Sequence, residues 1–200
     1  MIHREDCTMK RLTAIMLSFT LLLCLLAGCG GSKEWKGTHH VEMEVDGYGV
    51  ITVEINADAA PITASNFLNL AKKGFYSNNS FYRVIPGFGI YGGDPNGNGS
   101  GTSGTTITGE FTANGVNNPL SNTAGAIGMA RGMHYDSASC QFYILASDAT
   151  YLDGDFAVFG YVTNGFNVVQ QICATVPTNG ADGYVSAVSQ PVIKGMTVLD

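Results

Sequence analysis

Apolar and polar residues alternate along two short segments near the start of the body of the chain. The alternation runs over 41–45 and again over 51–55, and Asp46-Gly47 lies between the two segments. An alternation of period two places every second side chain on the same face of a strand. Asp-Gly between two such runs favours a tight hairpin turn. The pattern therefore predicts a β-hairpin with one buried face.

The remaining pattern predicts more strands and only two helices. Pro61 begins one helix, where its missing N–H costs nothing, and Gly74 can end it. A second helix is predicted around 166–173. Further strands are predicted at 81–90 (interrupted by Pro-Gly), 126–130, 140–146, 157–162 and 192–198. This arrangement favours a mainly β domain, a closed antiparallel β-barrel with a helix at each end.

The first 28 residues have the features of an export signal. Lys10 and Arg11 precede an uncharged apolar stretch, 12–26, which is short for a membrane span. The stretch leads into Leu-Ala-Gly-Cys29, which resembles a bacterial lipobox. In that resemblance the chain is cut before Cys29, and the cysteine thiol carries a diacylglycerol. An ordinary signal peptide that happens to end in cysteine is the alternative.

The expected organisation of the chain follows from the interpretation of Leu-Ala-Gly-Cys29 as a lipobox. We expect a signal peptide over 1–28, a lipidated cysteine with a tether over 29–39, and one domain over 40–200. The location expected is extracytoplasmic, with the protein lipid-anchored to the bacterial cell membrane. The sequence leaves open whether translation begins at Met1 or at Met9, which would give a Met-Lys-Arg start.

Composition and charge exclude several classes of protein. The chain has 200 residues and a formal net charge of −6, so it lacks the basic surface that a nucleic-acid partner requires. No spacing of Cys and His residues indicates a zinc site, so we expect no metal. In the body of the chain only Cys140 and Cys173 remain, and two separate buried thiols are favoured over a disulfide.

One arginine stands inside a strongly apolar run, Phe81-Tyr82-Arg83-Val-Ile-Pro-Gly-Phe88, which continues to Gly-Gly-Asp94. Gly-Met-Ala-Arg131, Gln141-Phe-Tyr-Ile and Leu152-Asp-Gly follow it along the chain. Together these segments resemble the cyclophilin family of peptidyl-prolyl isomerases over about residues 40–200. The resemblance implies an eight-stranded antiparallel β-barrel capped by two α-helices.

The resemblance also implies catalysis without nucleophile, metal or cofactor. Arg83 matches the arginine that hydrogen-bonds to the proline nitrogen, and Phe88 and Gln141 match the other two catalytic positions. Phe88, Met129, Tyr143 and Leu152 match the apolar socket for the proline ring. The residues matching substrate-binding positions are Tyr91, Met129, Ala130, Arg131, Tyr143, Tyr151, Leu152 and Phe156.

Several residues depart from the family pattern. The methionine of the socket is Gly89 here, and the glutamine that orients the arginine is Tyr91. Residues i and i+2 share a strand face, so the Tyr91 ring is expected to fill part of the space at Gly89. Tyr143 replaces a phenylalanine and brings a hydroxyl that needs a partner. Tyr151 and Phe156 stand in place of a tryptophan and a histidine.

The function expected from these residues is isomerisation of Xaa-Pro bonds in exported proteins. The alternative is a proline-peptide binding module on a cyclophilin scaffold with weak or no turnover, which the departures at Gly89 and Tyr91 keep open. The expected partners are proline-containing unfolded or exported polypeptides and the membrane, with the protein itself a monomer. Few charges flank the predicted socket, which favours tolerance of varied peptide sequences.

Overall fold

A computed structural model describes residues 33–200. The predicted signal peptide and the lipobox at Cys29 lie outside the described residues. Within 33–200, no helix is long and apolar enough to cross a bilayer.

The strands are β1 Thr38–Val45, β2 Gly49–Asn56, β3 Arg83–Ile85, β4 Gly89–Gly92, β5 Ala126–Met129, β6 Phe142–Leu145, β7 Val158–Asn164 and β8 Ile193–Val198. The helices are α2 Pro61–Lys72 and α3 Phe166–Thr175, with short 3₁₀ turns at Thr112–Asn114, Thr150–Leu152 and Ala187–Ser189.

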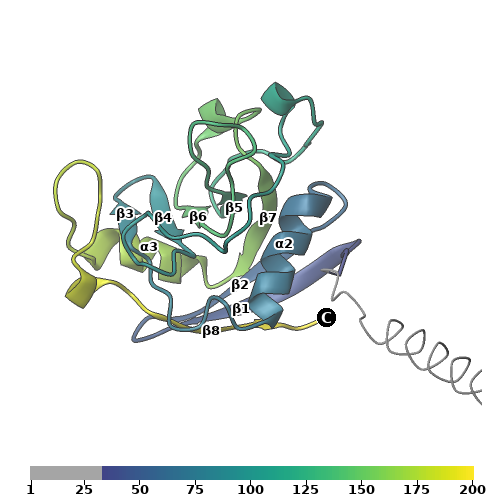
Figure 1. Ribbon diagram of the computed structural model, residues 1–200. Coiled ribbons are helices and arrows are strands. Elements are labelled where there is room, and N and C mark those ends of the chain that lie inside the picture. The colour runs from purple at the N-terminus through teal and green to yellow at the C-terminus, as the bar shows by residue number, and fades with distance from the viewer. Residues whose placement is uncertain (1–32) are drawn as a thin grey trace, which may run out of the picture. The chain divides into compact units, whose positions relative to one another are not determined.

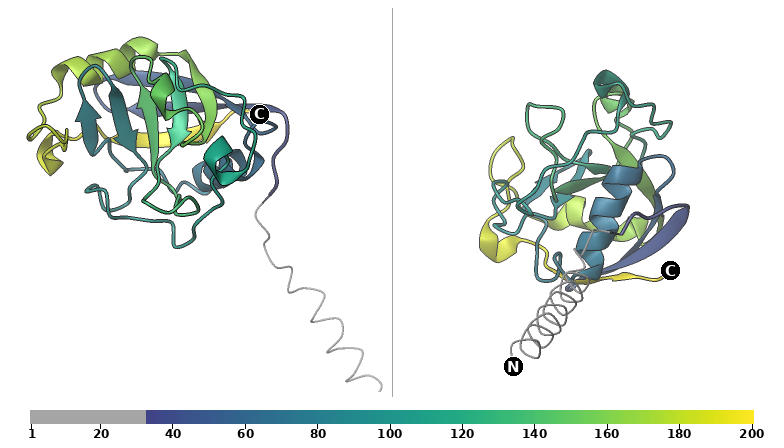
Figure 2. Two further views of the ribbon diagram at one scale, coloured as in Figure 1. Left: turned by 90° about the horizontal axis from the view of Figure 1, so that it is seen from above. Right: turned by 45° about the vertical axis from the view of Figure 1, so that its right-hand side comes forward.

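All eight strands belong to one antiparallel sheet. Their order is β3-β4-β6-β5-β7-β2-β1-β8. The hairpin predicted from the alternation is β1 and β2, which pair from Thr38 opposite Asn56 to Val45 opposite Gly49. The sheet curls strongly, and α2 and α3 lie apart from each other against it, each with residues buried in the same core (Figures 1 and 2).

The prediction of a closed barrel is wrong, because the sheet is a curled half-barrel with two edges. Strands β3 and β8 stand at those edges and form no ladder with each other. Irregular chain crosses the gap instead: the Asn78 N–H donates to the Ile193 carbonyl at 2.8 Å, and the Phe81 N–H donates to the Pro191 carbonyl at 2.9 Å. Proline has no N–H to continue a ladder at this point.

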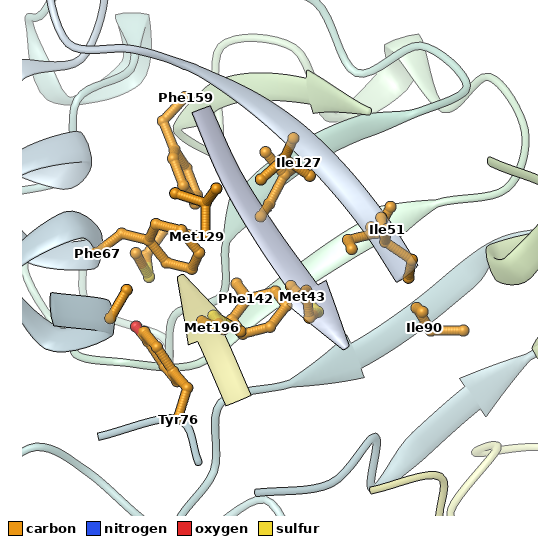
Figure 3. Close-up of a cluster of buried hydrophobic side chains, with 14 of the residues drawn as sticks. Met43, Ile51, Phe67, Tyr76, Ile90, Ile127, Met129, Phe142, Phe159 and Met196 are labelled. Atoms are coloured by element: carbon orange, nitrogen blue, oxygen red, sulfur yellow. The ribbon is translucent and has the colours of Figure 1, made fainter. Parts of the chain in front are cut away.

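The core fills the concave side of the sheet. Fully buried aromatic rings meet there: Phe67 of α2 lies 5.6 Å from Phe142 of β6 and 5.1 Å from Phe159 of β7, measured between ring centroids (Figure 3). From α3, Val169 and Ile172 are also fully buried. Within residues 33–200, the buried members of this core run from Trp35 to Met196.

Both cysteines of the body are free and buried, in agreement with the favoured expectation. Burial raises the pKa of the Cys140 thiol and of the Cys173 thiol to about 11. The thiolate is the reactive form of cysteine. Neither residue is therefore suited to nucleophilic chemistry at neutral pH.

Helix α2 is capped from a distant part of the chain. Ala60 precedes the helix and offers no side-chain cap. The buried carboxylate of Glu110 accepts the N–H of Ile62 at 3.0 Å and the N–H of Thr63 at 2.7 Å. A negative charge at a helix N-terminus is favoured by the exposed N–H groups and by the helix dipole. Glu110 thus links the long segment between β4 and β5 to helix α2, which contributes buried residues to the core.

We expect Glu110→Ala to lower the free energy of unfolding by about 2 kcal/mol, because two helix N–H donors lose a charged acceptor. Urea unfolding followed by circular dichroism measures this change. Glu42→Ala is the matched control, since Glu42 is exposed on β1 and its loss should cost little. Equal effects of the two substitutions would contradict the capping role.

Candidate functional site

A cavity of about 270 Å³ opens beside the β3–β4 edge of the sheet. Arg83 and Tyr91 line it from these two strands, and Gln141 lines it from the residue before β6. Ala130 and Arg131, which follow β5, form another wall. Five predicted site residues from four separate segments therefore meet at one cavity.

Uncharged groups hold the Arg83 side chain. Its Nε donates to the backbone carbonyl of Asp182 at 2.6 Å. Its guanidinium carbon lies 4.9 Å from the ring centroid of Tyr91 and 5.7 Å from that of Tyr184, within the range of cation–π attraction. The Asp182–Tyr184 segment is itself fixed to β3, because the Val84 N–H donates to the Gly183 carbonyl at 2.8 Å.

These contacts hold the guanidinium although Tyr91 stands where the family resemblance leads one to expect a glutamine. The Tyr91 ring supports the guanidinium through its face, and the Asp182 carbonyl accepts the hydrogen bond. Burial raises the pKa of Tyr91, and the positive charge of Arg83 offsets this only in part. The phenol therefore stays neutral across the physiological range, and no charge on it competes for the arginine.

Gln141 is held by a network that begins at a buried carboxylate. Its amide nitrogen donates to the carbonyls of Gly99 at 3.1 Å and Gly101 at 2.8 Å, and its amide oxygen accepts the Tyr82 hydroxyl at 2.6 Å. Asp94, only 1% exposed, accepts backbone N–H groups from the loop that carries these glycines, including that of Gly99. The loop after Asp94, which contains Gly99 and Gly101, thus positions the Gln141 amide.

An aromatic socket adjoins the cavity on the convex face of the sheet. It is the part of a larger apolar cluster in which the half-buried Phe88, Tyr91, Leu152 and Phe156 surround the buried Tyr143. The rings of Phe88 and Tyr91 are stacked, 6.2 Å apart at an angle of 12°, and Tyr91 lies 5.8 Å from Tyr143. Phe156 meets Tyr143 edge-on at 6.2 Å. The socket offers apolar rings of the kind that a proline ring would contact.

The hydroxyl that Tyr143 brings to the socket floor has the partner that the sequence required. It donates to the Asn122 side-chain oxygen at 2.6 Å, and the Asn122 side-chain nitrogen donates to Asp153 at 2.9 Å. Burial alone would raise the pKa of Asp153, but hydrogen bonds from Ser121 and Asn122 lower it overall. The Tyr143 ring also covers Gly128 so closely that any side chain there would collide with it.

The expectation about Gly89 and Tyr91 is half right. Tyr91 points to the convex face and joins the socket, as expected. However, Gly89 leaves no space to fill, because a Cβ at this position would collide with the Ile144 carbonyl oxygen of strand β6. Close approach of β4 to β6 is therefore what requires glycine here.

Two predicted binding residues lie elsewhere. Met129 was expected in the socket, but its side chain is 1% exposed and packs inside the core near Phe67 (Figure 3). Side chains alternate along β5, so a residue next to the cavity-lining Ala130 faces the opposite side. Tyr151 is 74% exposed and contributes to neither the cavity wall nor the socket.

Several contributors to the site were not identified as site residues from the sequence. Tyr184 stands between α3 and β8 in a segment without a periodic pattern, yet it reaches the cavity through its pairing with β3. Tyr82 and Asn122 act through hydrogen bonds to residues 59 and 21 positions away. Within residues 33–200, no cluster of His, Cys, Asp and Glu could hold a metal ion.

Comparison with known proteins agrees with this architecture. Residues 40–199 match the family described as cyclophilin type peptidyl-prolyl cis-trans isomerase. A peptidyl-prolyl cis-trans isomerase of Acinetobacter baylyi is 38% identical over 161 residues, covering 76% of this chain and 80% of that protein. A peptidyl-prolyl cis-trans isomerase-like 1 of Rhizopus delemar is 43% identical over 125 residues, covering 62% and 74%.

Solved structures show the same fold. A cyclophilin type peptidyl-prolyl cis-trans isomerase of Cryptosporidium parvum has a TM-score of 0.71 at 25% identity, over 82% of this chain and 98% of that one. A second crystal structure of that protein, in the presence of the dipeptide Ala-Pro, has a TM-score of 0.70 at 26% identity, over 80% and 99%. The chain belongs to the cyclophilin-type peptidyl-prolyl cis-trans isomerase family.

Proposed function

We propose that the chain accelerates rotation about Xaa-Pro bonds by donating a hydrogen bond from Arg83 to the prolyl nitrogen. Amide resonance sets a barrier of about 18–20 kcal/mol to this rotation. In the twisted state the nitrogen leaves the resonance and its lone pair can accept a hydrogen bond. A donor that binds the twisted state better than the planar one lowers the barrier to rotation. Each tenfold increase in rate corresponds to a barrier lower by about 1.4 kcal/mol.

The observation that supports this proposal most strongly is that the Arg83 guanidinium is held in place while its terminal nitrogens stay free to donate. The Nε bond to the Asp182 carbonyl fixes the plane, while the two terminal nitrogens make no hydrogen bond within residues 33–200. No carboxylate of the same residues lies within ion-pair distance of Arg83. An arginine also stays protonated at every working pH. Its free donors therefore remain available to a substrate in the cavity.

The aromatic socket supplies the second requirement, which is a place for the proline ring. Phe88 and Phe156 present apolar rings there, and Tyr143 is locked in position through Asn122. Groups held before the substrate arrives cost no reorganisation during the reaction. The Ala-Pro dipeptide named with the related Cryptosporidium structure supports a proline-containing ligand for this socket.

A binding module without turnover is the second candidate function. It is favoured by Tyr91, which fills the position of the orienting glutamine, and by Gly89, which adds no side chain to the socket. Such a protein would still bind proline peptides on the socket. Both functions therefore predict peptide binding, and only the isomerase predicts accelerated cis/trans exchange.

We expect Arg83→Ala to reduce catalysed cis/trans exchange about 100-fold, because the cavity loses its donor to the twisted amide. Arg83→Lys should lose nearly as much, since an ammonium lacks the fixed planar fork. Exchange NMR on a short Ala-Pro-containing peptide, with residues 30–200 of the protein, measures both changes.

The control for these variants is Lys73→Ala, which removes a cation that does not line the cavity. It should leave the exchange rate unchanged. Peptide resonances that shift on binding while exchange stays at the uncatalysed rate in the unsubstituted protein would contradict catalysis and support the binding module. Full activity in Arg83→Ala would contradict the arginine mechanism.

We further propose that the protein acts outside the cytoplasm, held to the cell membrane by a lipid on Cys29, where its substrates are exported chains. The proposal rests on the positive start, the uncharged stretch 12–26 and the lipobox-like Leu-Ala-Gly-Cys29. A cysteine with two or more acyl chains anchors stably, whereas a single chain binds only marginally.

Expression of the full chain in a bacterial host tests the anchor. We expect mass spectrometry to find a mature chain that begins at diacylglyceryl-Cys29 in the membrane fraction. Cys29→Ser should retain the leader uncut, while Cys140→Ser, which alters a buried thiol of the body, should be processed normally. Cleavage at another residue, with Cys29 unmodified, would overturn the lipoprotein proposal.

A further inference from the structure

Both arginines of residues 33–200 line the same cavity. Arg83 and Arg131 stand there together, and no Asp or Glu side chain belongs to the wall. The rest of this part of the chain is acidic, with 7 Lys and Arg against 14 Asp and Glu, a net of 7 − 14 = −7. The cavity is therefore a positively charged site in a negatively charged domain.

Arg131 is held in the same manner as Arg83, by neutral groups. Its Nε donates to the Asp155 backbone carbonyl at 3.0 Å, and its Nη1 donates to the Gly132 carbonyl at 3.0 Å. Its guanidinium carbon lies 4.7 Å from the ring centroid of Phe156 and 5.1 Å from that of Phe111. A third ring, that of Tyr135, lies 5.2 Å away.

No carboxylate neutralises either arginine within the described residues. The ion pairs there involve lysines and histidines with other acids. Asp155 and Asp182 hold the two arginines through backbone carbonyls, and their exposed side chains form no ion pair with them. The nearby carboxylate of Asp94 accepts backbone N–H groups beneath the loop.

The two arginines have different donors to spare. A guanidinium has five N–H donors, and Arg131 uses two of them in its backbone contacts. Three remain, on a planar fork whose geometry matches a carboxylate. The proposed reaction engages Arg83 with the prolyl nitrogen. Arg131 is therefore the cation left to meet a charged group of the substrate.

We propose that Arg131 makes the site selective for peptides with an Asp or Glu side chain next to the isomerised Xaa-Pro bond. This inference rests on the proposed function, because it takes the prolyl group to bind at Arg83 and the aromatic socket. It replaces the expectation that few charges flank the socket and that varied peptide sequences are therefore tolerated. Arg131 thereby acts as a specificity-determining residue in addition to any backbone contact that its segment makes.

The test uses peptides with blocked termini. Glu or Gln replaces Ala at one position at a time, at either of the two residues before proline or either of the two residues after it. We expect kcat/KM for isomerisation to be about fivefold higher with Glu than with Gln at one position at least. The Glu/Gln ratio should fall to about one in Arg131→Gln. Arg131→Lys should retain part of the preference, because it keeps the positive charge.

Lys73→Gln is the matched control, since it removes one positive charge outside the cavity and should keep the Glu/Gln ratio. Circular dichroism of each variant reports whether the fold is retained. A ratio of one at all four positions, or a ratio that survives Arg131→Gln, would overturn the inference. The ratio within each variant is the readout, so a general loss of rate does not obscure it.

NMR titration of the same peptides separates this inference from the proposed function. Tighter binding of the Glu peptides without accelerated exchange would contradict catalysis and retain the specificity of Arg131. Accelerated exchange with equal rates and equal affinities for Glu and Gln peptides would retain the isomerase and overturn the specificity.

Discussion

A row of aromatic rings between two arginines is the arrangement on which the rest of the site depends. The Arg83 guanidinium lies over Tyr91, Tyr91 meets Tyr143, Tyr143 meets Phe156, and Arg131 lies over Phe156. The rings give the arginines neutral support, so neither cation needs a carboxylate that would cancel its charge or occupy its donors. A cation kept in this state can serve a substrate, whereas one in an ion pair must first break that pair.

The fold makes this arrangement possible by placing the core and the site on opposite faces of one curled sheet. Phe142 of β6 points into the core, and Tyr143, the next residue, forms the socket floor. Polar groups around the socket fix its shape: Asn122 holds the Tyr143 hydroxyl, and the loop organised by Asp94 holds Gln141. The open edge beside β3 matters as well, because irregular chain there brings Tyr184 and the Asp182 carbonyl to Arg83.

The features that follow from local pattern could be predicted from the sequence. Alternation gave the β1–β2 hairpin, Pro61 marked the start of α2, and the apolar run around Arg83 contained the residues that line the cavity. The closed barrel was wrong because edge pairing depends on contacts between distant segments. Met129 was misplaced because its side chain faces the core. The support from Tyr184 and the Glu110 cap could not be found, since each acts on residues about 50 to 100 positions away and leaves no local pattern.

The proposed function requires the Arg83 guanidinium to donate to the prolyl nitrogen while the aromatic socket holds the proline ring. A crystal structure of residues 30–200 with a blocked Ala-Pro-containing peptide tests this most directly. We expect the proline ring against Phe88 and Tyr143, a terminal Arg83 nitrogen within hydrogen-bond reach of the prolyl nitrogen, and Arg83 Nε still bonded to the Asp182 carbonyl. A proline ring seated away from the socket, or a guanidinium turned away from the prolyl nitrogen, would contradict it.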